Sequence, residues 1–226
     1  LSLNPDLESK FADARRKIHE DLEKYLIYAA QGVLPDGQER IFRMLRTYHE
    51  AAARSRYGSA LMLEATEALM DAARKYINPG PTVEFFSDLQ RIVNFITLSA
   101  DVVEKKDAML EKVTETLYRR HPDKLKSAEN IKELTKRDMW VVLENCIYGT
   151  HAGGRERMLE VMSEFNLTLF RFQFGPRLII DAYQLLLQTC RAELHGGALA
   201  SLEPVLHKAI HFVAISADLA EKQPAM

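Results

Sequence analysis

Apolar residues recur at helical spacing along almost the whole chain. Between positions 4 and 31 one stripe is formed by Phe11, Ile18, Leu22 and Tyr25, and charged residues lie mostly off it. Asn4 and Pro5 are typical of a helix start, and Gly32 is typical of a helix end. The pattern therefore predicts a first helix over residues 4–31.

A second apolar stripe begins at Ile41 and Leu45 and continues through Leu69 and Ala73. It predicts one long helix over residues 38–77, with Gly58 as the place where that helix could kink. The sequence Asn-Pro-Gly-Pro at 78–81 then predicts a firm break, because proline restricts the residue before it and cannot continue a helix.

The most apolar stripe starts near Thr82, and its members are Phe85, Leu89, Ile92, Ile96 and Val103. A polar stretch at 104–107 interrupts the stripe, which returns and continues to Leu117. A helix with so wide an apolar face is expected to lie at the centre of the fold.

The stretch 119–136 is the most polar in the chain, and we place any internal sub-boundary there. Beyond it, helical spacing predicts an element ended by Gly149 and a helix over 155–170. A further helix is predicted from Pro176 to the Gly-Gly pair at 196–197, and a last one follows it. Residues 167–174 fit a period of 2 as well as 3.6, so helix and short extended segment are both open there.

These elements predict an all-α fold: one domain formed by a bundle of about seven to eight helices, with orthogonal or up-and-down packing. The helix that starts near 82, the one that starts at 176 and the last one should supply most of the core. The residues expected to be buried are Leu89, Ile96, Tyr183, Leu186, Ile210 and Val213.

Composition narrows the class of protein. The chain has 226 residues, a formal net charge of −2 and 47% hydrophobic residues, which suffices for a core without disulfides or metals. The near-neutral charge gives no broad electrostatic reason to expect nucleic acid as a partner. No apolar run reaches the roughly 18 residues typical of a membrane span, so none is expected.

The two cysteines, Cys146 and Cys190, lie in apolar helical surroundings. Buried free thiols are expected, as in the cytoplasm or another reducing compartment, and a disulfide between them is the alternative. The sequence starts at Leu1 rather than at methionine, so a removed targeting segment or an upstream domain is also open.

Two segments combine arginine with glycine or aromatic residues outside the predicted core. In the second helix, Arg43 and Arg46 belong to a locally basic stretch that also contains tyrosines. A glycine-rich loop that leads into a helix could present N–H groups to an anion, although it matches no nucleotide-binding pattern. The candidate residues of this loop are His151, Gly153, Gly154, Arg155 and Arg157.

A weaker candidate is a metal site on the last helix. Glu203, His207 and His211 follow at intervals of four and share one helical face. A structural zinc site usually has four ligands, and no fourth ligand is evident. We therefore expect no metal there. The sequence identifies no cofactor.

No catalytic signature is recognisable, which leans against an enzyme. The sequence favours a helical interaction or regulatory domain that binds a protein partner through the arginines of the second helix or through the 149–157 loop. Homo-oligomerisation is also open. The alternative is a helical sensor or enzyme for a small ligand, with an anion, haem or metal site between helices.

Overall fold

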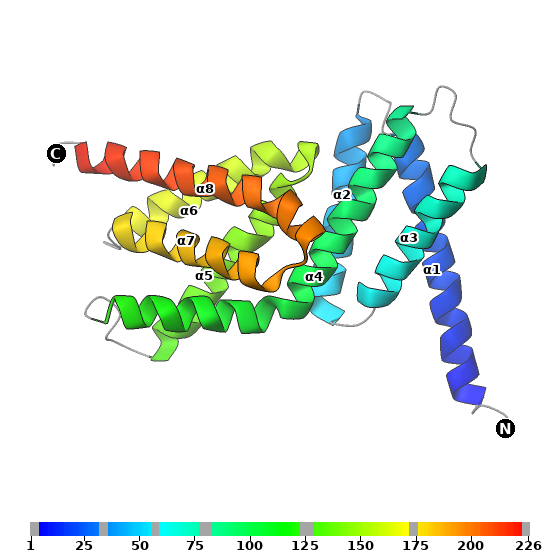
Figure 1. Cartoon of the computed structure of the whole chain (residues 1–226), viewed down its shortest axis with the longest axis horizontal. Coiled ribbons are helices and arrows are strands. Elements are labelled where there is room, and N and C mark those ends of the chain that lie inside the picture. The colour runs from blue at the N-terminus through cyan, green and yellow to red at the C-terminus, as the bar shows by residue number, and fades with distance from the viewer. Residues whose placement is uncertain are drawn as a thin grey trace. The chain divides into compact units, whose positions relative to one another are not determined.

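The computed structural model describes residues 5–31, 36–55, 59–76, 83–122, 129–171 and 176–222 (Figure 1). These ranges form helices without a strand, which confirms the predicted all-α class. The elements are α1 (Pro5–Gln31), α2 (Gly37–Ser55), α3 (Ser59–Tyr76), α4 (Val83–Arg120), α5 (Glu129–Gly149), the short 3-10 helix η1 (Ala152–Gly154), α6 (Arg155–Arg171), α7 (Pro176–Glu193) and α8 (Gly196–Lys222).

The prediction of one long helix over 38–77 is wrong, because the structure has two helices there. α2 and α3 each pack against α1. The junction at 56–58 lies outside the described residues, and it contains Gly58, the residue with the poorest intrinsic preference for helix after proline. As separate helices, α2 and α3 pack against the same neighbour, α1.

Other predicted boundaries agree with the structure or lie outside it. α4 runs without interruption through the polar stretch at 104–107. The predicted break at 78–81 lies outside the described residues, between the end of α3 at Tyr76 and the start of α4 at Val83. Residues 167–171 are helical as part of α6, whereas 172–174 are not described.

The chain groups into two compact units, residues 1–100 and 101–226, whose boundary lies inside α4. Contacts within a unit do not by themselves define a domain. The expectation of one domain with a sub-boundary near 119–136 therefore stays a prediction.

In the first unit, two hydrogen bonds tie α2 to the first part of α4. Gln38 Nε2 donates to Asp88 Oδ1 at 2.9 Å, and His49 Nδ1 lies 2.6 Å from Ser99 Oγ. Both pairs join residues that are 50 positions apart, so the two helices run in the same direction here. Leu89 and Ile96 are fully buried, as expected from the sequence.

In the second unit, α7 packs most extensively against α8, and α5 contacts α6, α7 and α8. Tyr183, Leu186 and Val213 are fully buried, as predicted. Ile210 is only partly buried, so its prediction is wrong: it lies at the edge of the buried stripe formed by Leu202, Val205, Leu206, Ala209 and Val213.

α5 supplies more of the core than the sequence pattern indicated. Its buried residues include Val142, Leu143, Cys146 and Ile147. Near the polar end of α5, Lys132 and Lys136 form ion pairs with the carboxylate of Glu111 on α4. These two ammonium groups lower the pKa of Glu111 to about 2. One helix thus combines a buried apolar end with an ionic contact to α4.

The two cysteines are free and buried, which confirms the thiol prediction. Burial raises the pKa of Cys190 to about 12 and raises the pKa of Cys146 as well. Because the thiolate is the reactive form, both side chains are poor nucleophiles in the folded protein.

At Gly149, the last residue of α5, side chains of α6 and α8 lie close to the backbone. A Cβ atom at this position would overlap Met158 Sδ and lie 3.0 Å from Val205 Cγ1. Both of these side chains are buried, so neither can move aside freely. We expect Gly149→Ala to lower the free energy of unfolding by about 1–3 kcal/mol in a denaturant titration.

The matched control is Gly197→Ala in the first turn of α8, where no atom lies within 4 Å of the added Cβ. This change should be neutral or stabilising by up to about 1 kcal/mol. Equal losses in the two variants would show that close packing is not what requires glycine at position 149.

Candidate functional site

An open groove lies between α1 and α2 and has a cavity volume of about 650 Å³. Each helix contributes four lining residues at positions i, i+3, i+4 and i+7, which form one face of a helix. The lining consists of Lys24, Ile27, Tyr28 and Gln31 from α1, and Arg40, Arg43, Met44 and Thr47 from α2.

Arg43 was predicted from the sequence as a binding residue, whereas the α1 residues of this groove were not. The α1 residues mix a cation, an aliphatic side chain, a phenol and an amide, so they do not stand out as a hydrophobic stripe. The adjacent face carries the burial signal instead, since Tyr25 and Ala29 are buried in the core. The α1 side of the groove could be recognised in the sequence as polar and apolar residues at positions i, i+3, i+4 and i+7 next to a stripe of buried residues.

The groove is positively charged along its lining. Lys24, Arg40 and Arg43 supply three cations, and the lining residues that the structure describes include no carboxylate. Two carboxylates lie just outside: Asp36 accepts from Arg40 Nε at 2.8 Å, and Glu39 Oε1 lies 3.7 Å from Arg43 Nε. Hydrogen bonding from Arg40 lowers the pKa of Asp36, so this carboxyl stays ionised at neutral pH.

These ion pairs are exposed and therefore exchangeable. The side chains of Arg43 and Glu39 are 66% and 56% exposed, and exposed pairs of this kind contribute only about 0–1 kcal/mol. An arriving anionic group can replace Glu39 at little cost. Arg43 can thus bind an acidic group without first breaking a strong contact.

The groove also has an apolar component that remains open to water. Ile27 is 55% exposed, and Tyr28 and Met44 are partly exposed. Small-molecule sites typically enclose most of their ligand, whereas this lining leaves large parts of its side chains in solvent. Its form suits an elongated segment with apolar and acidic side chains.

Arg46, the other arginine predicted on this helix, does not line the groove. Its Nε donates to Glu50 Oε1 at 2.7 Å, one turn further along α2. Arg46 lies one turn beyond Arg43 and is half-buried, and it is not among the lining residues of the groove. The structure therefore separates the two arginines that the sequence grouped.

The 149–157 loop uses its backbone donors internally. Gly153 N donates to His151 Nδ1 at 3.2 Å, Gly154 N donates to the His151 carbonyl, and Arg155 N donates to the Ala152 carbonyl. Thr150 N and His151 N donate to carbonyls of α5. An anion-binding cradle would need these donors, so the geometry favours a structural connector.

The side chains of this loop also differ in exposure. His151 and Gly154 are buried, and Gly153 is partly buried. Arg155 and Arg157 are exposed in the first turn of α6. These two arginines remain accessible to a partner, but the histidine predicted beside them does not.

The weaker candidate for a metal site, the Glu203–His207–His211 face of α8, is contacted by an arginine at Glu203 and His207. Arg191 of α7 donates through Nε to Glu203 Oε1 at 3.0 Å, and its Nη2 lies 3.2 Å from His207 Nε2. Because arginine can only donate, it engages the lone pair that a metal would need. Within the part of the chain that the structure describes, no group of three suitable side chains is arranged to hold a metal ion.

A polar cluster that the sequence did not connect joins α4 to the turn between α7 and α8. Asp101 accepts from the backbone N of His195 and lies 2.9 Å from its Nδ1, and Lys105 Nζ lies 2.6 Å from Asp101 Oδ1. Lys105 also donates to the Glu193 carbonyl. The lysine and the two His195 hydrogen bonds offset the burial of Asp101 and lower its pKa.

This cluster explains why a carboxylate is buried on an apolar helix. Asp101 accepts a hydrogen bond from the backbone N–H of His195 before the start of α8, and Lys105 donates one to the Glu193 carbonyl at the end of α7. The turn is therefore held at both helix termini. The pairing spans more than 90 positions in the sequence, which is why spacing alone did not reveal a partner for either residue.

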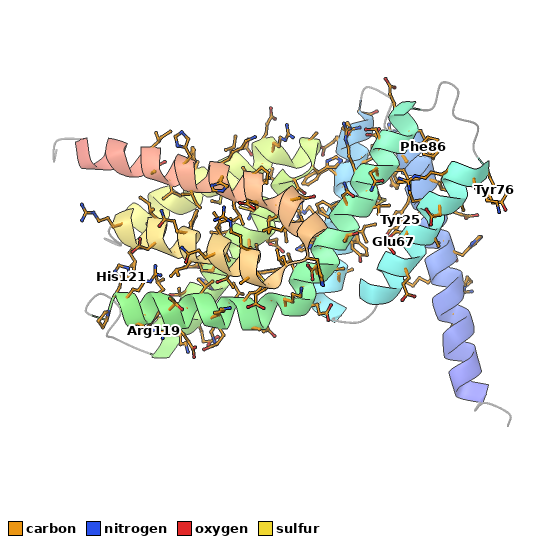
Figure 2. All side chains as sticks on the ribbon, in the orientation of Figure 1. Tyr25, Glu67, Tyr76, Phe86, Arg119 and His121 are labelled. Atoms are coloured by element: carbon orange, nitrogen blue, oxygen red, sulfur yellow. The ribbon has the colours of Figure 1, made fainter. Side chains whose placement is uncertain are left out.

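Two further observations concern the ends of helices. Figure 2 shows Tyr76 projecting from the end of α3, where Lys75 Nζ lies 5.0 Å from its ring centre. His121, at the end of α4 in the same view, lies with its Nε2 2.8 Å from Asp181 Oδ2 of α7. The second contact ties the end of α4 to α7, whereas the first joins two neighbouring residues of α3.

One helix of the described residues, from Gly196 to Ser216 in α8, is long and apolar enough to cross a membrane by length and composition, and a third of it is buried. This segment contains Glu203 and Lys208, and charged groups are costly in a bilayer core. The expectation that the chain has no membrane span stays a prediction.

Comparison with known proteins adds no assignment. No protein-family model, no curated protein and no solved structure matches this chain.

Proposed function

We propose that this protein is a binding module whose α1–α2 groove holds an acidic, amphipathic helix of a protein partner. The observation that carries the proposal is the groove itself: three cations and an exposed aliphatic side chain line one open channel between two helices. An amphipathic helix with its apolar residues on one face is the kind of segment that such grooves bind.

The cationic side chains of the lining determine that the partner segment should carry negative charge. Carboxylates of the partner would form ion pairs with Lys24, Arg40 and Arg43. Its aliphatic side chains would pack against Ile27 and Met44. Electrostatic complementarity of this kind governs specificity and association rate more than affinity. A basic helix with the same apolar spacing should therefore be rejected.

The test uses two labelled helical peptides with leucines at the same positions, one with glutamates and one with lysines between them. In fluorescence anisotropy the glutamate peptide should bind the whole chain, and added salt should weaken its binding. The lysine peptide should bind at least tenfold more weakly. Equal binding of both peptides, or binding of neither, would contradict the proposal.

Two double variants distinguish the groove from the 149–157 loop, which remains the second proposed contact. Lys24→Ala/Arg43→Ala should weaken binding of the glutamate peptide, whereas Arg155→Ala/Arg157→Ala should leave it unchanged. A loss confined to the second variant would move the binding site to the loop.

The alternative function, a small-ligand sensor or enzyme, is favoured by one observation. The exposed imidazole of His195 is backed by the buried carboxylate of Asp101, an arrangement that can support a general base. The same carboxylate also binds Lys105 and the backbone of the turn, so a structural role accounts for all its contacts. A visible chromophore or stoichiometric metal in the purified protein would favour the alternative.

A further inference from the structure

The acidic helix that the groove requires has a counterpart on this same chain. The outer face of α6 exposes Leu159, which is 45% exposed, together with Glu156 and Glu160. These residues lie at i, i+3 and i+4, so the leucine and the two carboxylates share one side of the helix. The opposite side is buried through Met158 and Met162, which holds the acidic face outward.

Among the described residues, the exposed large apolar side chains can be compared for these features. The exposed large apolar side chains are Ile27, Tyr76, Leu134, Leu159 and Ile215. Ile27 is part of the groove itself. Tyr76 has a lysine beside it, Lys75, and Ile215 has a histidine one turn before it, His211, so neither is flanked by glutamates. Leu134 has Arg137 one turn later. Leu159 alone among these five has exposed glutamates both before and after it within one turn.

Charges of the opposite sign match as well. Arg155 and Arg157 begin α6, and the groove is bordered by the exposed carboxylates of Asp36 and Glu39. The groove thus has an aliphatic residue, a cationic lining and a carboxylate border. The α6 face has an aliphatic residue, two carboxylates and two arginines at its start, so the charges of the two surfaces are complementary.

Resting on the proposed function of the groove, we propose that α6 of a second copy of this chain occupies the α1–α2 groove. The contact joins two different surfaces, so it is heterologous and can add further copies head to tail. A single helix in a groove buries less area than a standard stable interface, and association is therefore weak and concentration-dependent.

Sedimentation velocity of the whole chain over a rising concentration series tests this proposal. The average mass of the wild type should rise with concentration and fall with added salt. The groove variant Lys24→Glu/Arg43→Glu and the helix variant Glu156→Lys/Glu160→Lys should each remain monomeric at the same concentrations. A wild type that stays monomeric throughout, or a variant that associates like the wild type, would overturn it.

Mixing the two variants gives the sharpest result. For this mixture the variants are made neutral, because a reversed groove could also pair with a reversed α6. Glu156→Gln/Glu160→Gln retains a functional groove and Lys24→Ala/Arg43→Ala retains a functional α6, so together they can make one contact only. The mixture should form 1:1 dimers and nothing larger. A mixture that remains monomeric while the wild type associates would place the interface elsewhere.

Two controls keep the outcome interpretable. Glu64→Lys/Glu67→Lys reverses two exposed acidic residues on α3 and should leave association unchanged. If circular dichroism shows that a reversed variant is unfolded, Lys24→Ala/Arg43→Ala and Glu156→Gln/Glu160→Gln replace the reversed pairs. A wild type that binds the glutamate peptide but remains monomeric refutes self-association alone and leaves the proposed function standing.

Discussion

Replacing Leu186 with alanine is expected to lower the free energy of unfolding by about 2–5 kcal/mol. Leu186 is fully buried on α7, the helix that packs most extensively against α8, and its neighbours Tyr183 and Cys190 on the same stripe are also fully buried. Removing its isobutyl group loses the transfer free energy of the buried atoms and leaves a cavity that closely packed helices can fill only in part.

The measurement is a denaturant titration followed by tryptophan fluorescence. Trp140, the only tryptophan of the chain, lies on α5 in the same unit as Leu186, so its emission reports the unfolding of that unit. The control Leu134→Ala, on a side chain that is 44% exposed, should cost much less than Leu186→Ala. A loss below about 1 kcal/mol at Leu186 would mean that α7 does not lie in the core.

The second large effect is expected from reversing the charge of the groove. Lys24→Glu/Arg43→Glu should weaken binding of the glutamate peptide by roughly tenfold or more. Two attractive contacts become repulsive, each exposed contact is worth about 0.2–1 kcal/mol, and 1.4 kcal/mol corresponds to a factor of ten. The same variant should gain affinity for the lysine peptide, because the preferred sign of the partner is reversed.

A matched control reverses two arginines outside the groove. Arg74→Glu/Arg119→Glu changes the net charge by the same amount, and both side chains are exposed. This control should bind the glutamate peptide like the wild type. Equal losses in both variants would mean that the overall charge of the protein, and not the groove, attracts the peptide.

Much of the fold could be predicted from apolar spacing. The stripe through Leu89 and Ile96 correctly identified a long helix with a fully buried face, and the proline at 176 correctly marked the start of α7. The spacing failed where α2 and α3 separate. Periodicity continues in phase across the junction near Gly58, and only packing against α1 distinguishes two short helices from one long helix.

The candidate site was less predictable, for two physical reasons. The groove combines α1 and α2 faces of mixed polarity, and the hydrophobic pattern signals burial rather than half-exposed surfaces such as that of Ile27. The pairing of Asp101 with His195 depends on tertiary contact between distant positions, which one sequence does not encode visibly. The arginines of the second helix could be predicted as candidates because the charge of each residue is evident from the sequence alone.

The claim that the α1–α2 groove holds an acidic helix is tested most directly by photo-cross-linking. A glutamate peptide carrying a photoreactive group at its central leucine position is irradiated with the whole chain, and the adducts are located by mass spectrometry. We expect adducts within residues 24–31 and 40–47, and these adducts should disappear in Lys24→Glu/Arg43→Glu. Adducts concentrated within residues 149–157, or an unchanged pattern in the reversed variant, would contradict it.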